Sequence, residues 1–284
     1  MILDSHHHFW NYSPEAYGWI GQGMDVLKHN FGPTELKPLI DEAGIDGVIS
    51  VQARTEVAEN DALLAHAEAH PSWIKGVVGW VDLTRADVGE TLGIYSSREK
   101  FVGVREVLQG MDDDAYCLRE DFNRGIGMLH DFGLVYDILI FHRHLPNAVK
   151  LVDRHENQVF VLDHVAKPDI QSATPSPAWV EGMKALGKRE HVFCKVSGMV
   201  TEVAKDIEWT PELLRPYFDV ALEAFGPERL MFGSDWPVCR LRSDYLRWKQ
   251  TVDAFVAELS PNERADIMGG NAARAYGIAL ESRR

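Results

Sequence analysis

The chain has 284 residues, and its 43 acidic and 29 basic side chains give a formal net charge of −14 at pH 7. So acidic a protein is a poor match for the phosphates of nucleic acid or for an anionic membrane, and no apolar run reaches the roughly 20 residues that span a bilayer. The N-terminus lacks a signal-peptide pattern, and the three scattered cysteines exclude a disulfide framework. We therefore expect a cytoplasmic globular protein that binds neither nucleic acid nor membranes.

Short apolar runs recur along the chain, and several are rich in β-branched and aromatic residues, as expected for strands that are buried on both faces. They follow one another at a spacing close to the ~30 residues of a βαβ unit. We predict strands at Met1–Asp4, Ile45–Gln52, Ile74–Val81, Phe101–Val104, Leu134–Phe141, Gln158–Leu162, His191–Val196 and Arg229–Gly233.

Segments of helical pattern lie between most of these runs. The first, Thr34–Ala43, follows Pro33 and ends at Gly44, a residue type that commonly closes helices. The others are predicted at Glu59–Ala69, Asp121–Phe132, Leu145–His155, Trp179–Arg189 and Pro211–Phe225. Strands alternating with helices fit a (β/α)₈ barrel of about 250 residues. An open doubly wound sheet would be favoured by a glycine-rich phosphate turn after the first strand, which the sequence lacks. We predict a single-domain, TIM-like α/β barrel over residues 1–284.

Imidazole and carboxylate side chains stand at the ends of several predicted strands, where barrels of this kind carry their chemistry. His6 and His8 are two residues apart in an extended segment, so they share a face, and His7 points elsewhere. Later strand ends add candidates of the same two chemical types: Glu106, His142, His164 and Asp235. Such a set suits Zn²⁺ or a similar divalent ion.

Each candidate also has a purely structural interpretation. The consecutive histidines could be a tag remnant, Asp235 could cap the next segment, and Glu106 could simply pair with Arg105. However, about half of the 12 histidines fall at predicted strand ends. This convergence favours a functional cluster.

These residues lie in segments that resemble a known family. The chain is similar to the amidohydrolase superfamily, whose pattern is HxH after the first strand, His after the fifth and sixth, and Asp after the eighth. Within it, the chain most resembles the amidohydrolase-2 branch, which includes sugar lactonases, and the stretches Trp19–Gly21 and Met24–Leu27 look most like L-fuconolactonases. The segments that carry the resemblance span the chain: Asp4–Trp10, Tyr17–Leu27, Gly103–Gln109, Phe141–Pro146, Val161–Pro168, Cys194–Glu202 and Met231–Cys239.

The resemblance implies a distorted (β/α)₈ barrel that hydrolyses a ring ester. His6 and His8 match the strand-1 pair, His164 matches the strand-6 histidine and Asp235 the strand-8 aspartate. Two positions depart from the branch. Glu106 stands where many of its lactonases have histidine, and His142 stands where they usually have none.

Metal dependence stays open at this point, because some members of the branch work without metal. In one interpretation, Zn²⁺ or a similar ion is held by the matched residues, and Glu106 and His142 recruit a second ion. In the other, the histidines donate hydrogen bonds to the developing oxyanion. The number of candidate ligands favours metal. In both, Asp235 is the base that activates water, with His6, His8 and His164 beside it.

Aromatic and polar side chains near the strand ends are candidates for binding substrate. Flat apolar walls for a sugar ring could come from Trp10, Trp19, Trp80 and Trp236. Hydroxyl groups could be bound by Gln52, Arg54, Asp82, Arg105, His144, Lys167 and Lys195. Arg54 and Arg105 could instead hold a carboxylate, but a dicarboxylate lactone would call for a denser arginine cluster. A neutral aldonolactone is therefore the preferred substrate.

We thus expect a sugar-lactone hydrolase of the L-fuconolactone type. The alternatives on the same scaffold are a metal-dependent decarboxylase of aromatic acids, a hydrolase of an amide or a dicarboxylate lactone, and a non-catalytic binding barrel. A homo-oligomer is compatible with the sequence.

Overall fold

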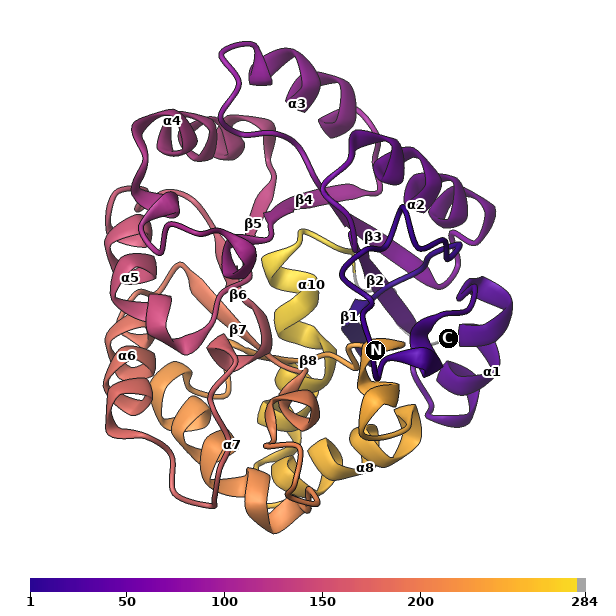
Figure 1. Ribbon diagram of the computed structural model, residues 1–284, viewed down its shortest axis with the longest axis vertical. Coiled ribbons are helices and arrows are strands. Elements are labelled where there is room, and N and C mark those ends of the chain that lie inside the picture. The colour runs from indigo at the N-terminus through magenta and orange to yellow at the C-terminus, as the bar shows by residue number, and fades with distance from the viewer. Residues whose placement is uncertain (280–284) are drawn as a thin grey trace.

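Eight parallel strands form one sheet whose neighbours follow chain order, in a computed structural model that describes residues 1–279 (Figure 1). The strands are β1 (Leu3–His7), β2 (Gly47–Val51), β3 (Ile74–Gly79), β4 (Phe101–Glu106), β5 (Val135–Ile138), β6 (Phe160–Leu162), β7 (Val192–Val196) and β8 (Leu230–Phe232). The barrel closes where His7 bridges Trp236, with Asp235 N donating to His6 O over 2.7 Å. The predicted single-domain, TIM-like barrel is confirmed.

Helices cover the outside of the barrel (Figure 1). They are α1 (Pro33–Glu42), α2 (Val57–Ala69), α3 (Val88–Ser96), α4 (Glu120–Leu129), α5 (Leu145–Asp153), α6 (Pro177–Gly187), α7 (Pro211–Phe225) and α8 (Tyr245–Val256). Two short helices follow, α9 (Pro261–Ala265) and α10 (Asn271–Ala275), and α10 lies over one end of the barrel. Several begin with proline in the first turn and a side-chain cap, as where Thr210 Oγ1 accepts from Leu213 N at the start of α7. No helix within residues 1–279 is long and apolar enough to cross a membrane.

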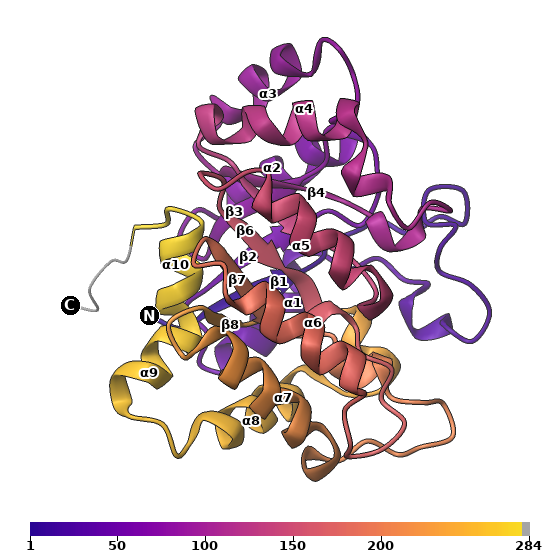
Figure 2. The ribbon, with the colours of Figure 1, turned by 90° about the vertical axis from the view of Figure 1, so that its left-hand side faces the viewer.

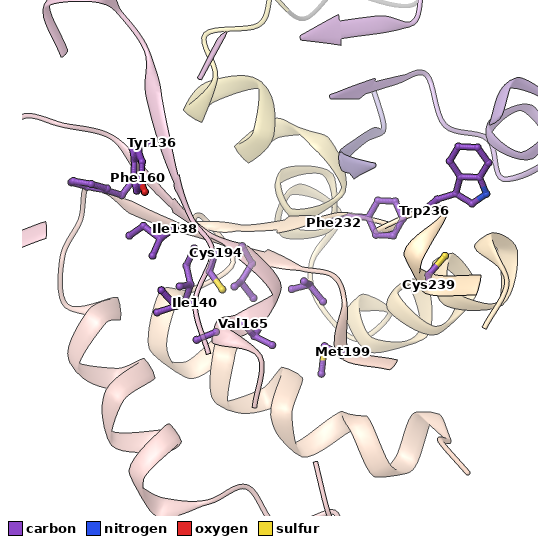
Figure 3. Packing of buried hydrophobic residues seen from close by; sticks show 14 of the residues in the cluster. Tyr136, Ile138, Ile140, Phe160, Val165, Cys194, Met199, Phe232, Trp236 and Cys239 are labelled. Carbon is purple, nitrogen blue, oxygen red and sulfur yellow. The ribbon is translucent and has the colours of Figure 1, made fainter. Parts of the chain in front are cut away.

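Two apolar layers hold the barrel together. The larger fills the space between strands and helices, where Tyr136, Phe160 and Cys194 are buried (Figure 3). The smaller lies inside the barrel and includes Tyr276, which immediately follows α10. Helix α10 and the N-terminus lie at the same end of the barrel (Figure 2), so the opposite, carboxyl end of the strands is left for the site.

Candidate active site

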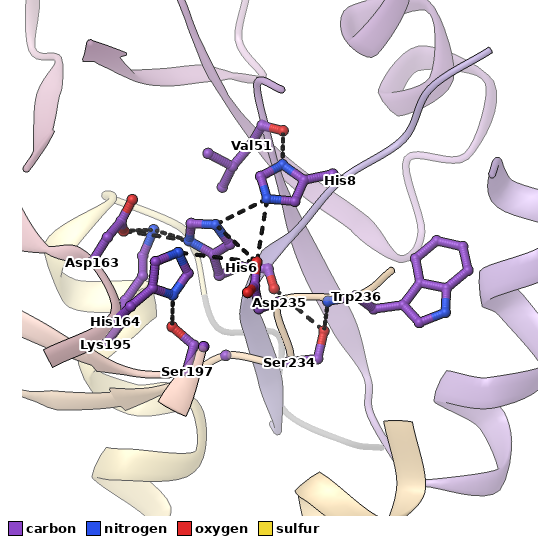
Figure 4. Close-up of polar contacts among 12 residues, drawn as sticks. His6, His8, Val51, Asp163, His164, Lys195, Ser197, Ser234, Asp235 and Trp236 are labelled. Carbon is purple, nitrogen blue, oxygen red and sulfur yellow. Dashed lines mark hydrogen bonds and ion pairs between the residues drawn. The ribbon is translucent and has the colours of Figure 1, made fainter. Parts of the chain in front are cut away.

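The floor of the site is formed by His6 and His8 of the first strand segment and by Asp235, three residues after β8 (Figure 4). The Nε2 atoms of His6 and His8 lie 3.3 Å apart. Asp235 Oδ1 is 3.4 Å from His8 Nε2 and 3.8 Å from His6 Nε2. His7 points elsewhere, with Nε2 2.9 Å from Ser50 Oγ. The alternation of the extended chain thus brings the two imidazoles to one face, and closure of the barrel brings the Asp235 carboxylate to them.

Hydrogen bonds behind the two rings orient them. His8 Nδ1 lies 2.8 Å from Val51 O, and because a carbonyl only accepts, Nδ1 carries the proton and Nε2 keeps its lone pair. His6 Nδ1 lies 3.3 Å from Asp163 Oδ1, a carboxylate in the position that orients histidine ligands of metals. The three inward atoms lie close enough to bind one ion. This donor set fits zinc.

His164 follows β6 on strained backbone. The backbone has positive φ angles over four residues, 53° at His164, 47° at Val165, 59° at Ala166 and 46° at Lys167. Residues other than glycine rarely adopt such angles. The His164 ring accommodates this turn by lying against Gly198, where a Cβ would come within 2.6 Å of Nδ1. Its Nδ1 is 2.8 Å from Ser197 Oγ, and its Nε2 is 4.0 Å from Asp235 Oδ1. The turn therefore directs Nε2 toward the carboxylate.

Burial and neighbouring charges set the protonation states of the floor. Burial lowers the pKa of His164 to about 4 and holds the pKa of His6 well below its usual value. Burial alone would raise the pKa of Asp235, but the neighbouring His164, His8 and Lys167 outweigh it, so that pKa is lowered. At neutral pH, a carboxylate therefore faces the uncharged rings of His6 and His164.

Beneath the floor lies a set of buried charges that we term the inner charge cluster: Arg105, Asp137, Asp163 and Lys195. Lys195 Nζ lies 2.5 Å from Asp137 Oδ2, 3.0 Å from Asp163 Oδ1 and 3.1 Å from His6 Nδ1. Arg105 Nη1 lies 2.8 Å from Asp163 Oδ2. Tyr276 Oη donates to Asp137 from below, over 2.7 Å. The cluster thereby fixes His6 from behind.

Above the floor opens a cavity of about 630 Å³. Most of the residues expected to contact substrate or metal line it: His8, Trp19, Gln52, Arg54, Trp80, Asp82, Arg105, Glu106, His164, Lys167 and Asp235. Trp19 stands at the rim and is 43% exposed. His6 lies below the lining and is fully buried.

Other expected residues lie away from the cavity lining. His142 is four residues beyond the end of β5, and its Nδ1 contacts Lys167 O at 3.1 Å. His144 Nε2 pairs with Asp114 Oδ1 at 2.7 Å. Trp10 and Trp236 are buried against Phe31, with ring centroids 5.5 and 5.3 Å from it. The sequence pattern placed these side chains at strand ends, but the loops turn them into the protein.

Two further residues have contacts that differ from those expected for their predicted roles. Lys195, considered for binding hydroxyl groups, is fully buried in the inner charge cluster. Glu106, considered as a metal ligand, accepts hydrogen bonds from Trp80 Nε1 and Val107 N. Neither Glu106 nor His142 belongs to the potential metal-binding groups found among residues 1–279, which are His6, His8, Asp235 and His6, Asp163, His164.

Sequence reasoning did not assign roles to Asp137, Ser197 or Tyr276. Asp137 is buried inside β5, and Tyr276 lies far away in sequence at the other end of the barrel. No local motif marks these two residues. The charged residues within otherwise apolar strands were the one available signal, because an unpaired charge there would be costly.

Comparison with known proteins matches this arrangement to a family. The amidohydrolase family model matches residues 3–278. A protein named L-fucono-1,5-lactonase from Burkholderia multivorans is 38% identical over 98% of this chain and 96% of its own length. One of the same name from Burkholderia ambifaria is 35% identical over 97% and 95%. A crystal structure of a Burkholderia multivorans amidohydrolase with bound zinc superposes with a TM-score of 0.94, at 38% identity, over 98% of this chain and 100% of that one. The chain thus belongs to the amidohydrolase family.

Proposed function

We propose that this protein hydrolyses a sugar lactone of the L-fucono-1,5-lactone type. One observation carries the proposal. An ionised carboxylate, Asp235, shares the floor of an open cavity with three imidazoles, and the cavity can hold a small sugar ring. The relatives named L-fucono-1,5-lactonase cover nearly the whole chain and support the choice of substrate.

Asp235 is the proton-transferring group in this proposal. Lactone opening needs a proton removed from the attacking water and a proton delivered to the departing alkoxide, and one carboxylate can do both in turn. Asp235 is only 3% exposed yet lines the cavity. Its carboxylate can therefore contact a water molecule bound in the cavity while it stays shielded from bulk solvent. His8 Nε2 at 3.4 Å and His164 Nε2 at 4.0 Å lie beside this carboxylate.

We also propose that a divalent ion, preferentially zinc, is held by His6, His8 and Asp235, with His164 beside them. When bound, the ion would lower the pKa of a water molecule and polarise the lactone carbonyl. The donor atoms support this assignment because Val51 O leaves the Nε2 lone pair of His8 facing Asp235, and His6 Nε2 lies 3.8 Å from the same carboxylate oxygen. The zinc-bound relative supports the choice of metal.

The deciding experiment is a pH-indicator assay of the purified protein on sugar γ- and δ-lactones, beginning with L-fucono-1,5-lactone. Acid release by the wild type and its loss in Asp235→Asn would support both the activity and the role of Asp235. No acid release from any lactone, with zinc supplied, would refute the proposed function. Metal analysis before and after chelation, with His8→Asn as the variant, tests the ligand assignment separately from activity.

A further inference from the structure

The charges that line the cavity are not equally available to a substrate. Each of its three cations is already paired with a carboxylate. Arg54 lies 3.3 Å from Glu56, Arg105 lies 2.8 Å from Asp163, and Lys167 lies 3.6 Å from Glu202. Arg105 Nη2 also donates a hydrogen bond to the backbone carbonyl of Gln52 over 2.5 Å. A carboxylate on a substrate would therefore meet cations whose charge is already balanced by a neighbouring carboxylate.

Two carboxylates of the lining have no such cation partner. Among residues 1–279, neither Glu106 nor Asp82 forms an ion pair. Glu106 is 5% exposed and accepts from Trp80 Nε1 with Oε2 and from Val107 N with Oε1, each over 2.8 Å. Asp82 uses Oδ1 for both of its hydrogen bonds, from the backbone and the hydroxyl of Thr84. Each carboxylate thus keeps acceptor capacity for another donor.

The two carboxylates act on the same part of the cavity. Asp82 is close enough to raise the pKa of Glu106, although burial of Glu106 is the larger cause of that shift. Trp80, two residues before Asp82, lines the cavity and donates a hydrogen bond from its indole nitrogen to Glu106. An aromatic surface beside free acceptors can receive the C–H face and the hydroxyl groups of a sugar together.

We propose that Glu106 and Asp82 determine the specificity of this site by accepting hydrogen bonds from hydroxyl groups of the lactone and excluding lactones that carry a carboxylate. This inference rests on the proposed function. Carboxylates accept but do not donate hydrogen bonds when ionised, so a hydroxyl satisfies them and a second carboxylate does not. A like charge brought beside them meets cations that already have carboxylate partners, and such repulsion is an effective way to reject a wrong substrate.

The first test uses the wild-type protein and two lactones that differ at one carbon. L-galactono-1,4-lactone ends in a CH₂OH group, and L-galactaro-1,4-lactone has a carboxylate in its place. We expect kcat/KM to favour the neutral lactone at least about tenfold, because a substrate carboxylate beside two like charges is repelled. Equal values for the two would overturn the inference while leaving lactone hydrolysis intact. Inactivity on every lactone, including L-fucono-1,5-lactone, would instead refute the proposed function.

The second test removes each charge without changing side-chain size. Glu106→Gln should lower kcat/KM for the neutral lactone about 10- to 100-fold, as expected for losing a charge-assisted hydrogen bond. The preference for the neutral lactone should shrink, and the metal content should stay at the wild-type value. Asp82→Asn keeps the oxygen that Thr84 contacts, so it should fold normally and shift the preference in the same direction by a smaller factor.

The matched control is Glu42→Gln, which makes the same change in net charge at an exposed position on α1. It should keep both the rate and the preference of the wild type. An unchanged preference in both Glu106→Gln and Asp82→Asn would overturn the inference. Loss of bound metal in folded Glu106→Gln would also overturn it, because Glu106 would then be a ligand.

Discussion

The inner charge cluster and the cavity lining use the same residue types in opposite ways. Below the floor, Lys195, Asp137 and Asp163 are fully buried and bonded to one another. In the lining, Glu106 and Asp82 have hydrogen-bond partners but form no ion pair within residues 1–279. Buried charges need partners to be tolerated, so the cluster is committed to holding His6. The lining keeps acceptor capacity, which makes it the region that can respond to a ligand.

The largest effect should come from Asp235, where the two regions meet. Asp235→Asn keeps the size of the side chain and removes the base, so kcat should fall at least about 1,000-fold, within the range set by proton transfer. Single-turnover kinetics on L-fucono-1,5-lactone would measure the chemical step. A folded variant that kept a tenth of the wild-type kcat would contradict the assignment of Asp235.

Lys195→Met tests the claim that the inner charge cluster needs its cation. The variant would leave Asp137 and Asp163 buried around a missing charge, and breaking such a group typically costs about 3–5 kcal/mol of folding free energy. Urea unfolding would measure the loss. The control is Lys205→Met at an exposed position, where about 0.5 kcal/mol or less is expected. Equal stability of the two variants would show that the cluster is not a unit.

His164→Asn tests the catalytic role of the imidazole separately from the strained backbone turn on which it lies. Asparagine tolerates the left-handed backbone of this position but cannot place a ring nitrogen toward Asp235. We expect a loss of kcat/KM of about 100-fold, the size found for removal of one group that stabilises a transition state. Thermal unfolding should change little. A kcat/KM within threefold of the wild-type value would show that the His164 ring does not take part in catalysis.

The sequence could predict the barrel, because all eight apolar runs overlap observed strands. It was less accurate where strands end. Met1–Asp4 was too short a prediction, since β1 continues to His7 through hydrogen bonds that no hydropathy pattern reveals. Helix α3 was missed, and its two glycines obscure the helical pattern. Helix α8 could have been found, because Asp244 caps an amphipathic segment.

The floor of the site follows from local spacing, whereas its support does not. His6 and His8 share a face because strand residues alternate, a rule that needs no tertiary information. The turn that positions His164 depends on contact with Gly198 from the next strand's loop. Asp137 and Tyr276 are 139 residues apart and meet only because α10 crosses the far end of the barrel. Pairings of this kind are properties of the closed barrel.

The smallest effect should come from Tyr276→Phe, which removes one hydrogen bond to the inner charge cluster and leaves the cation in place. The single hydroxyl proton of Tyr276 is shared between the two oxygens of Asp137, which lie 2.7 and 2.9 Å from Oη. Removing a donor from a buried carboxylate should cost about 1–3 kcal/mol of folding free energy. Urea unfolding at pH 7 would measure the loss, with kcat expected to change less than in His164→Asn.

The pH dependence of the stability lost in Tyr276→Phe shows whether the loss arises from the hydrogen bond to Asp137. Burial raises the pKa of Asp137 to about 6, against the opposing effects of Lys195 and Tyr276, so the folded state binds a proton there more readily than the unfolded state. The contribution of Asp137 to stability therefore falls as pH rises from about 4 through 6. Without the Tyr276 hydroxyl, that pKa rises further and the fall continues to higher pH. The stability gap between wild type and Tyr276→Phe should consequently widen between pH 5 and pH 8, and a gap that stays constant would assign the loss to packing instead of the hydrogen bond.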